Sequence, residues 1–189
     1  MKVVSFYTKD TPYAEEVQNL IESCEKYKVN YSIEEVENLG KWEWNCGQKP
    51  KIIQNALKNF PNENLFYVDA DAVFKREPNW SHFEDLQYPA FAWFKWQSAE
   101  GEVTELLSGS IYIPNNEFSD LMIRAWCALQ EQNKEMWDQR VLQHLVTKHD
   151  LPSYQLPLEW CKVADYMKSV DNPYIEHYQA SRRFKDKLS

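Results

Sequence analysis

Residues 1–36 alternate between strand and helix patterns, and this order strongly limits the possible folds. Lys2–Thr8 is rich in β-branched and aromatic residues, as in a buried strand. Thr11-Pro12 then starts a helix, with Thr as the cap and Pro at the first helical position. Val29–Val36 follows with strand alternation. Because parallel neighbours need a crossover helix, this order predicts an α/β fold with a mainly parallel central sheet flanked by helices.

The rest of the chain continues to mix helices and strands. The predicted elements are a helix from Pro50, strands at Leu65–Val68, Ala90–Trp96 and Ser110–Ile113, helices at Phe118–Gln132 and Trp137–Lys148, and a short strand at Tyr154–Leu156. Glu37–Lys49 is predicted to be irregular, and the tail from Asp171 to Ser189 has many charges and few apolar residues. Since the chain has 189 residues and no linker or repeat, we expect one domain over residues 1–189.

Composition excludes several classes of protein. The formal net charge of −8 disfavours binding to nucleic acid, because an acidic surface repels a phosphate backbone. No two of the four cysteines stand in a Cys-x-x-Cys spacing, so we expect no zinc or redox site and four reduced thiols. No apolar run is long enough for a membrane span or a signal peptide, and the protein is therefore predicted to be soluble and cytoplasmic.

Two carboxylates follow the apolar strand Leu65–Val68 directly, in the segment Asp69-Ala70-Asp71. Ligands of open α/β sheets gather at the carboxyl ends of strands. Carboxylate oxygens bind Mg²⁺ or Mn²⁺, which keep positions for substrate phosphates. Small Ala70 lets a ligand approach the backbone. An Asp-x-Asp pair alone is common in solvated turns, but apolar residues on both sides make uncompensated anions costly here, and a metal is the simplest compensation.

In this context the sequence resembles the nucleotide-sugar-dependent glycosyltransferases of the GT-A fold. The run Leu-Phe-Tyr-Val-Asp-Ala-Asp-Ala-Val, beginning at Leu65, is close to the form of their metal motif. Leu107–Tyr112 is similar to the strand after it, and Trp137-Asp138-Gln139 is similar to the Asp-Gln pair of retaining, glycogenin-like members. His177 resembles their C-terminal metal ligand. The resemblance covers most of the chain in the family's order.

The resemblance implies a role for each matching residue. Asp71 and His177 are expected to bind Mn²⁺ or Mg²⁺, and Asp69 to contact the ribose and the metal. Asp138 and Gln139 are expected at the donor sugar as the catalytic pair, which favours a retaining mechanism. The other residues expected to contact a nucleotide-sugar donor, a UDP-linked one, are Phe6, Tyr7, Thr8, Lys49, Ala70, Gly109, Gln179, Ser181 and Arg182.

Without the resemblance, several of these residues have ordinary structural interpretations. His177 in a polar tail is typical of a surface histidine, and Asp138 of a carboxylate in the first turn of a helix. Lys49 before Pro50 is typical of surface charge, and Arg182 of a solvated basic tail. The chain also lacks the glycine that glycogenin-like members carry after their histidine, which leaves the phosphate contacts of the tail open.

Other functions remain open at this point. A sugar nucleotidyltransferase would carry a Gly-rich basic loop after the first strand, and residues 9–12 do not form one. A non-catalytic carbohydrate-binding module would use exposed Trp and bind neither metal nor nucleotide. Because the chain is short for the fold, the acceptor site is expected to be small or to need a partner, and water then competes as acceptor in donor hydrolysis. Glu159 is a further candidate for a base or an acceptor contact.

Overall fold

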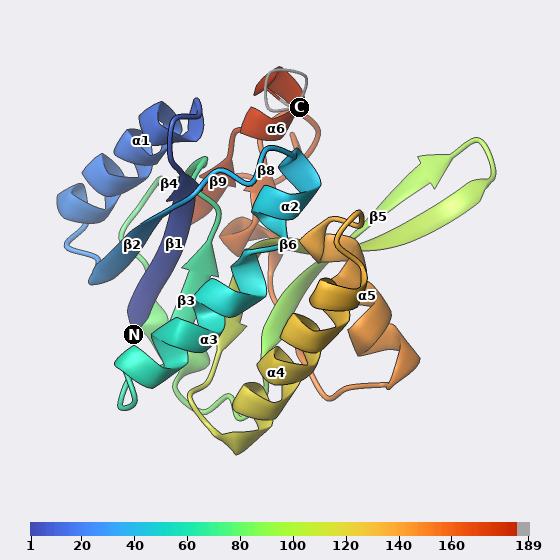
Figure 1. Cartoon of the computed structure of the whole chain (residues 1–189). Coiled ribbons are helices and arrows are strands. Elements are labelled where there is room, and N and C mark those ends of the chain that lie inside the picture. The colour runs from blue at the N-terminus through green and yellow to red at the C-terminus, as the bar shows by residue number, and fades with distance from the viewer. Residues whose placement is uncertain (185–189) are drawn as a thin grey trace.

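The computed structural model describes residues 1–184, and its central sheet has six strands in the order β2-β1-β3-β6-β5-β7 (Figure 1). A second sheet has the order β4-β9-β8. The strands are β1 (Lys2–Thr8), β2 (Tyr31–Val36), β3 (Leu65–Val68), β4 (Ala72–Phe74), β5 (Ala90–Ser98), β6 (Gly101–Ile113), β7 (Tyr154–Gln155), β8 (Lys162–Val163) and β9 (Ile175–His177). The helices are α1 (Tyr13–Lys26), α2 (Trp42–Cys46), α3 (Lys49–Asn59), α4 (Glu117–Gln132), α5 (Asp138–Lys148) and α6 (Ala180–Phe184), with 3₁₀ turns η1 (Trp80–Phe83) and η2 (Leu158–Trp160).

The central sheet is mostly parallel, as predicted. β1 pairs in parallel with both β2 and β3, and β7 pairs in parallel with β5. β6 runs antiparallel to both β3 and β5. Since β1 and β3 are parallel neighbours, their carboxyl ends, Thr8 and Val68, lie at the same edge of the sheet, and this edge is where ligands of α/β sheets gather.

Side-chain alternation along the strands builds two cores, one on each face of the sheet. In β3, Phe66 and Val68 join a core that includes α1, η1, η2 and the small sheet. Leu65 and Tyr67 join the other core, which contains the apolar faces of α3, α4 and α5. Figure 1 shows α3, α4 and α5 together on one side of the sheet and α1 with β4 and β9 on the other.

The N-terminal predictions need small corrections. The second strand begins at Tyr31 rather than Val29, because the Val29 N–H instead donates to the Cys24 carbonyl oxygen at the end of α1. The helix begins at Tyr13 with Pro12 at the N-cap position, one residue later than predicted, although the Tyr13 N–H still donates to Thr11 Oγ1 at 3.3 Å. The segment 37–49, predicted to be irregular, contains the short helix α2.

Larger corrections concern three later segments. The strand predicted at Ser110–Ile113 is only the end of the long strand β6, which forms a hairpin with β5. The predicted tail is partly buried over its described part, because Ile175, His177 and Ala180 lie inside while Tyr178 and Arg182 stay exposed. There β9 pairs with β4, a strand that the sequence analysis did not assign.

Candidate functional site

The Asp69-Ala70-Asp71 segment forms a tight turn between β3 and β4. The Asp69 N–H donates to the Gly109 carbonyl oxygen at 2.9 Å, which extends the β3–β6 pairing by one residue. The Asp69 carbonyl oxygen then accepts from the Ala72 N–H at 3.0 Å, which closes the turn. Strand pairing on both sides of the turn thus fixes both carboxylates at the edge of the sheet.

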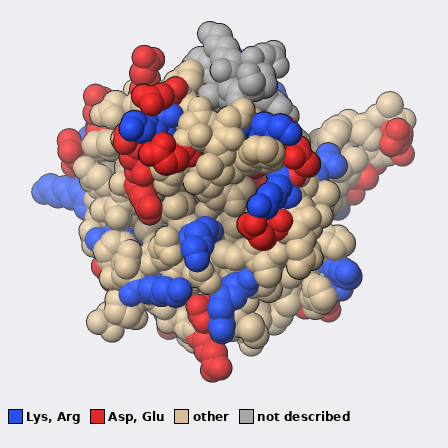
Figure 2. Space-filling view, viewed as in Figure 1, with Lys and Arg blue, Asp and Glu red and all other residues tan. Residues whose placement is uncertain are grey.

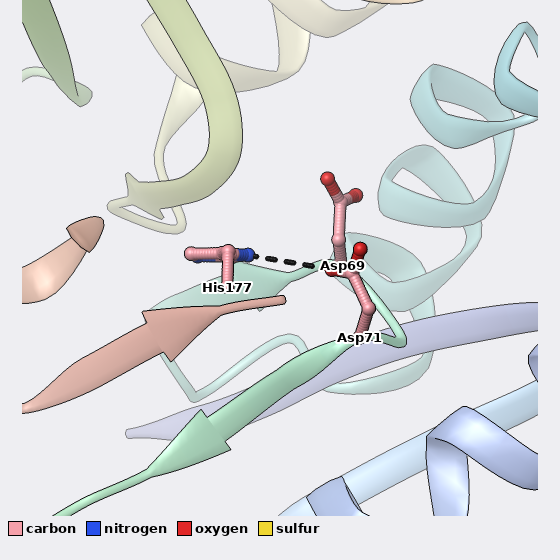
Figure 3. Close-up of side chains that lie close together, drawn as sticks. All are labelled: Asp69, Asp71 and His177. Carbon is pink, nitrogen blue, oxygen red and sulfur yellow. Dashed lines mark ion pairs between the residues drawn. The ribbon is translucent and has the colours of Figure 1, made fainter. Parts of the chain in front are cut away.

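His177 reaches this turn through strand register. Ala72 is paired with His177 in the β4–β9 ladder, so the imidazole stands beside Asp71 (Figure 3). Its Nδ1 lies 3.6 Å from Asp71 Oδ1, and its Nε2 lies 2.9 Å from Ser110 Oγ. One oxygen from each of Asp69 and Asp71 and one nitrogen of His177 all lie within 4.8 Å of one another. The cluster therefore presents two carboxylates and one imidazole to a common point.

The electrostatics of the cluster favour a positive charge between its members. Burial lowers the pKa of His177, but Cys161 and Asp71 oppose this effect and raise it to about 10. Burial raises the pKa of Asp71, yet His177 and the Ala180 N–H, 2.8 Å from Oδ2, hold it below its usual value. The proton on His177 thus compensates the carboxylate of Asp71. A divalent cation bound here would replace this proton, because a metal ligates only the neutral imidazole.

Gly109 makes the close approach of these side chains possible. A Cβ atom at position 109 would lie 3.0 Å from His177 Cε1, 3.2 Å from His177 Nδ1 and 3.4 Å from Asp69 Oδ2. Real Cβ atoms essentially never approach another atom more closely than this first distance. Glycine at this position therefore leaves room for the histidine ring against β6.

Lys49 lies beneath the cluster and bridges two carboxylates. Its Nζ is 3.0 Å from Asp69 Oδ1 and 2.7 Å from Asp138 Oδ2, and it also donates to Ser108 Oγ at 3.0 Å. Its side chain is only 4% exposed. Burial lowers the pKa of Lys49, but Asp138 and Asp69 outweigh burial and raise it above the usual value. Lys49 is thus a buried, charged lysine and not the surface charge of the ordinary interpretation.

Asp69 itself is held from two sides. Tyr67 donates its hydroxyl to Asp69 Oδ1 at 2.8 Å, and the same oxygen contacts Lys49. Burial raises the pKa of Asp69 and so do Asp71 and Asp138, whereas Lys49 lowers it, and the result is a raised pKa. The side chain still keeps 36% of its surface exposed. Tyr67 and Lys49 therefore hold Oδ1 of Asp69 in place, while the exposed part of the side chain can contact a ligand.

Asp138 and Gln139 open α5 and meet β6. Asp138 Oδ2 accepts from Ser108 Oγ at 2.8 Å in addition to the Lys49 contact. Gln139 Oε1 accepts from the Ser108 N–H at 3.2 Å, and its Nε2 donates to Glu105 Oε1 at 2.7 Å. Asp138 is therefore part of the same polar network as Asp69. Asp138 also lies in the first turn of α5, as its ordinary structural interpretation predicted.

A cavity of about 660 Å³ lies against this network, and its volume falls within the range of small-molecule sites. Every residue that the sequence analysis assigned to the metal, the nucleotide or the donor sugar lines it. These residues are Phe6, Tyr7, Thr8, Lys49, Asp69, Ala70, Asp71, Gly109, Asp138, Gln139, His177, Gln179, Ser181 and Arg182. The structure thus brings together residues from six separate stretches of the chain, while their contacts with a ligand stay predictions.

The cavity also contains residues that the sequence analysis missed. Glu159, proposed as a base, is not among the described residues that line it, whereas Glu105 is. Glu105 carried no sequence signal of its own, because it lies within the unpredicted part of β6. Ser108 donates to the carboxylate of Asp138, and Tyr67 donates to that of Asp69. The only sequence signal for these two residues was that they stand close to Gly109 and Asp69 along the chain.

Comparisons with known proteins agree with this arrangement at the level of fold. No protein-family model matches the sequence, and no curated protein matches it. Solved structures do match. A crystal structure of a glycosyltransferase involved in the glycosylation of the major capsid of PBCV-1 has a TM-score of 0.69 and 19% sequence identity, over 98% of this chain and 97% of that one. The glycosyltransferase GlyE of Streptococcus pneumoniae TIGR4 has a TM-score of 0.57 and 14% identity, over 94% of this chain and 54% of that one.

The chain therefore has a glycosyltransferase fold, and the predicted α/β fold class is confirmed. It also contains the predicted cluster of an Asp-x-Asp pair with a histidine. Over the described residues, no helix has both the length and the apolar character needed to cross a bilayer.

Proposed function

We propose that this protein transfers a sugar from a UDP-linked donor to an acceptor hydroxyl, with Mn²⁺ or Mg²⁺ bound by Asp69, Asp71 and His177. The convergence of these three side chains on a cavity of about 660 Å³, in a glycosyltransferase fold, supports the proposal most strongly. The two similar structures are glycosyltransferases. Because their sequence identity is low, they support the assignment of the fold but not the choice of a donor or an acceptor.

The residues of the cluster fit a hard divalent cation. Carboxylate oxygens suit Mn²⁺ and Mg²⁺, and an imidazole makes Mn²⁺ the better match. Three protein ligands leave positions for phosphate oxygens. When bound, the cation supplies Lewis-acid stabilisation of the negative charge that develops on the diphosphate leaving group.

The protein's own groups position the donor. Gln179, Ser181 and Arg182 follow β9 directly and line the cavity next to His177, so we assign them to the diphosphate. The end of β1, from Phe6 to Thr8, is assigned to the nucleoside. Lys49 and Ser108 both contact Oδ2 of Asp138, so Oδ1 is assigned to accept from the hydroxyls of the donor sugar.

The proposal includes retention of the anomeric configuration, because the Asp138-Gln139 pair lies in the cavity beside Gly109. Gln139 is held by Ser108 and Glu105, so its amide is fixed in place rather than free to move. Proton NMR of the freshly formed product measures the configuration of the new bond. An inverted product would contradict retention alone and leave sugar transfer intact.

Titration calorimetry with UDP, with and without Mn²⁺, tests the function first. We expect affinity for UDP to rise at least about tenfold when Mn²⁺ is present, because the cation bridges the protein carboxylates and the phosphates. Release of UDP from a panel of UDP-sugars then identifies the donor. Absence of UDP binding in both conditions would favour a carbohydrate-binding module. UDP release that no acceptor accelerates would favour donor hydrolysis.

Gly109→Ala is expected to weaken Mn²⁺ binding by roughly 10- to 100-fold, the range seen when the support of a metal ligand is lost. The added methyl group would displace the His177 ring, which lies 3.0 Å from the position of the new Cβ. Calorimetric titration with Mn²⁺ measures the loss, and thermal unfolding checks the fold. Wild-type affinity for Mn²⁺ in a folded Gly109→Ala protein would show that His177 is not a ligand.

A further inference from the structure

The hairpin of β5 and β6 extends away from the body of the protein, and we call its residues 94–105 the arm (Figure 1). Strand pairing divides the arm into two faces, because successive side chains point to opposite sides. The pairs Phe94–Glu105 and Trp96–Val103 share one face. The pairs Lys95–Thr104 and Gln97–Glu102 share the opposite face, which is polar and charged. The arm therefore has one largely apolar face.

This apolar face borders the cavity. Trp96 and Glu105 both line it, and so does Tyr166 from the turn after β8. The ring of Phe94 lies 5.3 Å from the ring of Tyr166, which joins the arm to that turn. Trp96 is 43% exposed and Tyr166 is 37% exposed. Two large aromatic side chains thus keep open surface beside the polar site instead of completing a core.

The position of the arm separates it from the nucleotide end of the cavity. Figure 1 shows β1 and α1 on one side of the molecule and the tip of the arm on the other. The residues assigned to the nucleoside come from β1, and those assigned to the donor sugar, Gly109 and Asp138, come from β6 and the start of α5. Residues 101–105 of the arm belong to β6, the strand that also carries Gly109. The arm therefore extends outward from the end of the cavity that is assigned to the donor sugar. A second substrate would reach the proposed donor sugar from this side.

We propose that the apolar face of the arm, with Trp96 as its central residue and Tyr166 beside it, binds a neutral saccharide as the acceptor. This inference rests on the proposed sugar transfer and adds the class of acceptor to it. Aromatic rings present flat apolar surfaces to the C–H faces of sugar rings, and Glu105 provides a carboxylate for a hydroxyl at the same wall. The chain is thus able to bind an acceptor without a second domain.

Charge favours a neutral acceptor over an anionic one. Glu105 lines the cavity, Glu100 and Glu102 stand near the tip of the arm, and the chain has a net charge of −8. Figure 2 shows acidic groups on the arm, which is otherwise largely uncharged in this view. Lys95 pairs with Glu102 at 3.0 Å, but Glu100 and Glu105 leave the arm with a net negative charge, so an anionic glycan would bind more weakly.

The test uses the full chain with its best UDP-sugar and Mn²⁺, and lactose, maltose and cellobiose as neutral probes. We expect at least one disaccharide to accelerate UDP release. Trp96→Ala should raise the KM for that disaccharide at least about tenfold, and Trp96→Phe should raise it less, because a ring is retained. UDP affinity by calorimetry should change less than about twofold in both variants.

Gln97→Ala is the matched control, because it alters the same strand on the opposite face. Its KM for the disaccharide should stay within about twofold of the wild-type value. Equal KM values for Trp96→Ala and Gln97→Ala would overturn the proposal. So would stronger acceleration by sialyllactose than by lactose, or light scattering that shows a dimer which Trp96→Ala dissociates.

Two results separate this inference from the proposed function. If UDP binds with Mn²⁺ but none of the neutral disaccharides accelerates its release, the acceptor assignment is wrong and the donor site stands. If UDP does not bind to the wild-type protein at all, the proposed function fails first. The pair of measurements therefore distinguishes the two failures.

Discussion

Asp71→Asn is expected to lower metal-dependent UDP release by about 10²-fold or more, which matches the loss of a charged group that stabilises a transition state. Asparagine has nearly the same size, and its side-chain oxygen can still accept from the Ala180 N–H, which lies 2.8 Å from Asp71 Oδ2. The substitution removes the negative charge that faces His177 and the proposed cation. Initial rates of UDP release over a series of Mn²⁺ concentrations measure the effect.

The control for this variant is Asp120→Asn. Asp120 lies on α4, where it pairs with Arg124 on the surface. Its loss should leave UDP release within about twofold of the wild-type rate, since exposed ion pairs contribute little. Asp71→Asn should still unfold as a folded protein does, at a lower temperature than the wild type, because the buried pair with His177 is lost. Undiminished Mn²⁺-dependent turnover in Asp71→Asn would remove Asp71 from the metal site and with it the proposed mechanism.

Lys49→Met is expected to lower the free energy of unfolding by about 3–5 kcal/mol, the usual cost of breaking a buried ion pair from one side. The substitution shortens the side chain by one atom and leaves Asp138 and Asp69 without their shared ammonium, which lies 2.7 and 3.0 Å from their oxygens. Because the pKa of Lys49 is raised, its contribution is fully present below the usual lysine value and is lost only above it. The loss should therefore be the same throughout the range of about pH 6 to 9, where lysine is charged in both states.

Lys41→Met is the matched control for Lys49→Met. Lys41 pairs with Glu135 at 3.0 Å, but both side chains are largely exposed, and its loss should cost only a small part of the Lys49 effect. The double variant Lys49→Met with Asp138→Asn should recover part of the lost stability, because one uncompensated carboxylate is removed. Urea denaturation measures all these variants. A loss for Lys49→Met no larger than for Lys41→Met would show that Lys49 is not needed to hold the two carboxylates.

Local patterns predicted the strands that carry the cavity and several of the residues that line it. β1 and β3 were readable because they are short, apolar and buried on both faces, and the Asp-x-Asp pair stands directly at the end of β3. Gly109 and the Asp138-Gln139 pair were found because the order of motifs resembles a known family. The structure brings all of them to one cavity. These residues could be predicted because each lies near the end of a strand or helix, or within a motif that resembles the family's.

Other parts of the site depend on distant contacts and were not predicted. β4 and β9 have three residues each, and neither has enough length for a strand pattern of its own. His177 stood in a segment that looked like a polar tail, and only its pairing with Ala72 buries it. The strand predicted at Ala90–Trp96 includes the start of the arm, but residues 97–105 were missed because this exposed stretch is mostly polar. The sequence around Lys49 does not indicate that it pairs with Asp69 and Asp138, because Asp138 lies on another helix, α5.

The β4–β9 pairing has a consequence for folding. It joins residue 72 to residue 177, so the cluster is incomplete until nearly the whole described chain has been made and has docked. Pairings between segments far apart in sequence require costly loop closure and form slowly compared with local contacts. The proposed metal affinity would therefore arise late in folding, and a partly folded chain with an intact β1–β3 core would hold both aspartates and still lack His177, the proposed third ligand.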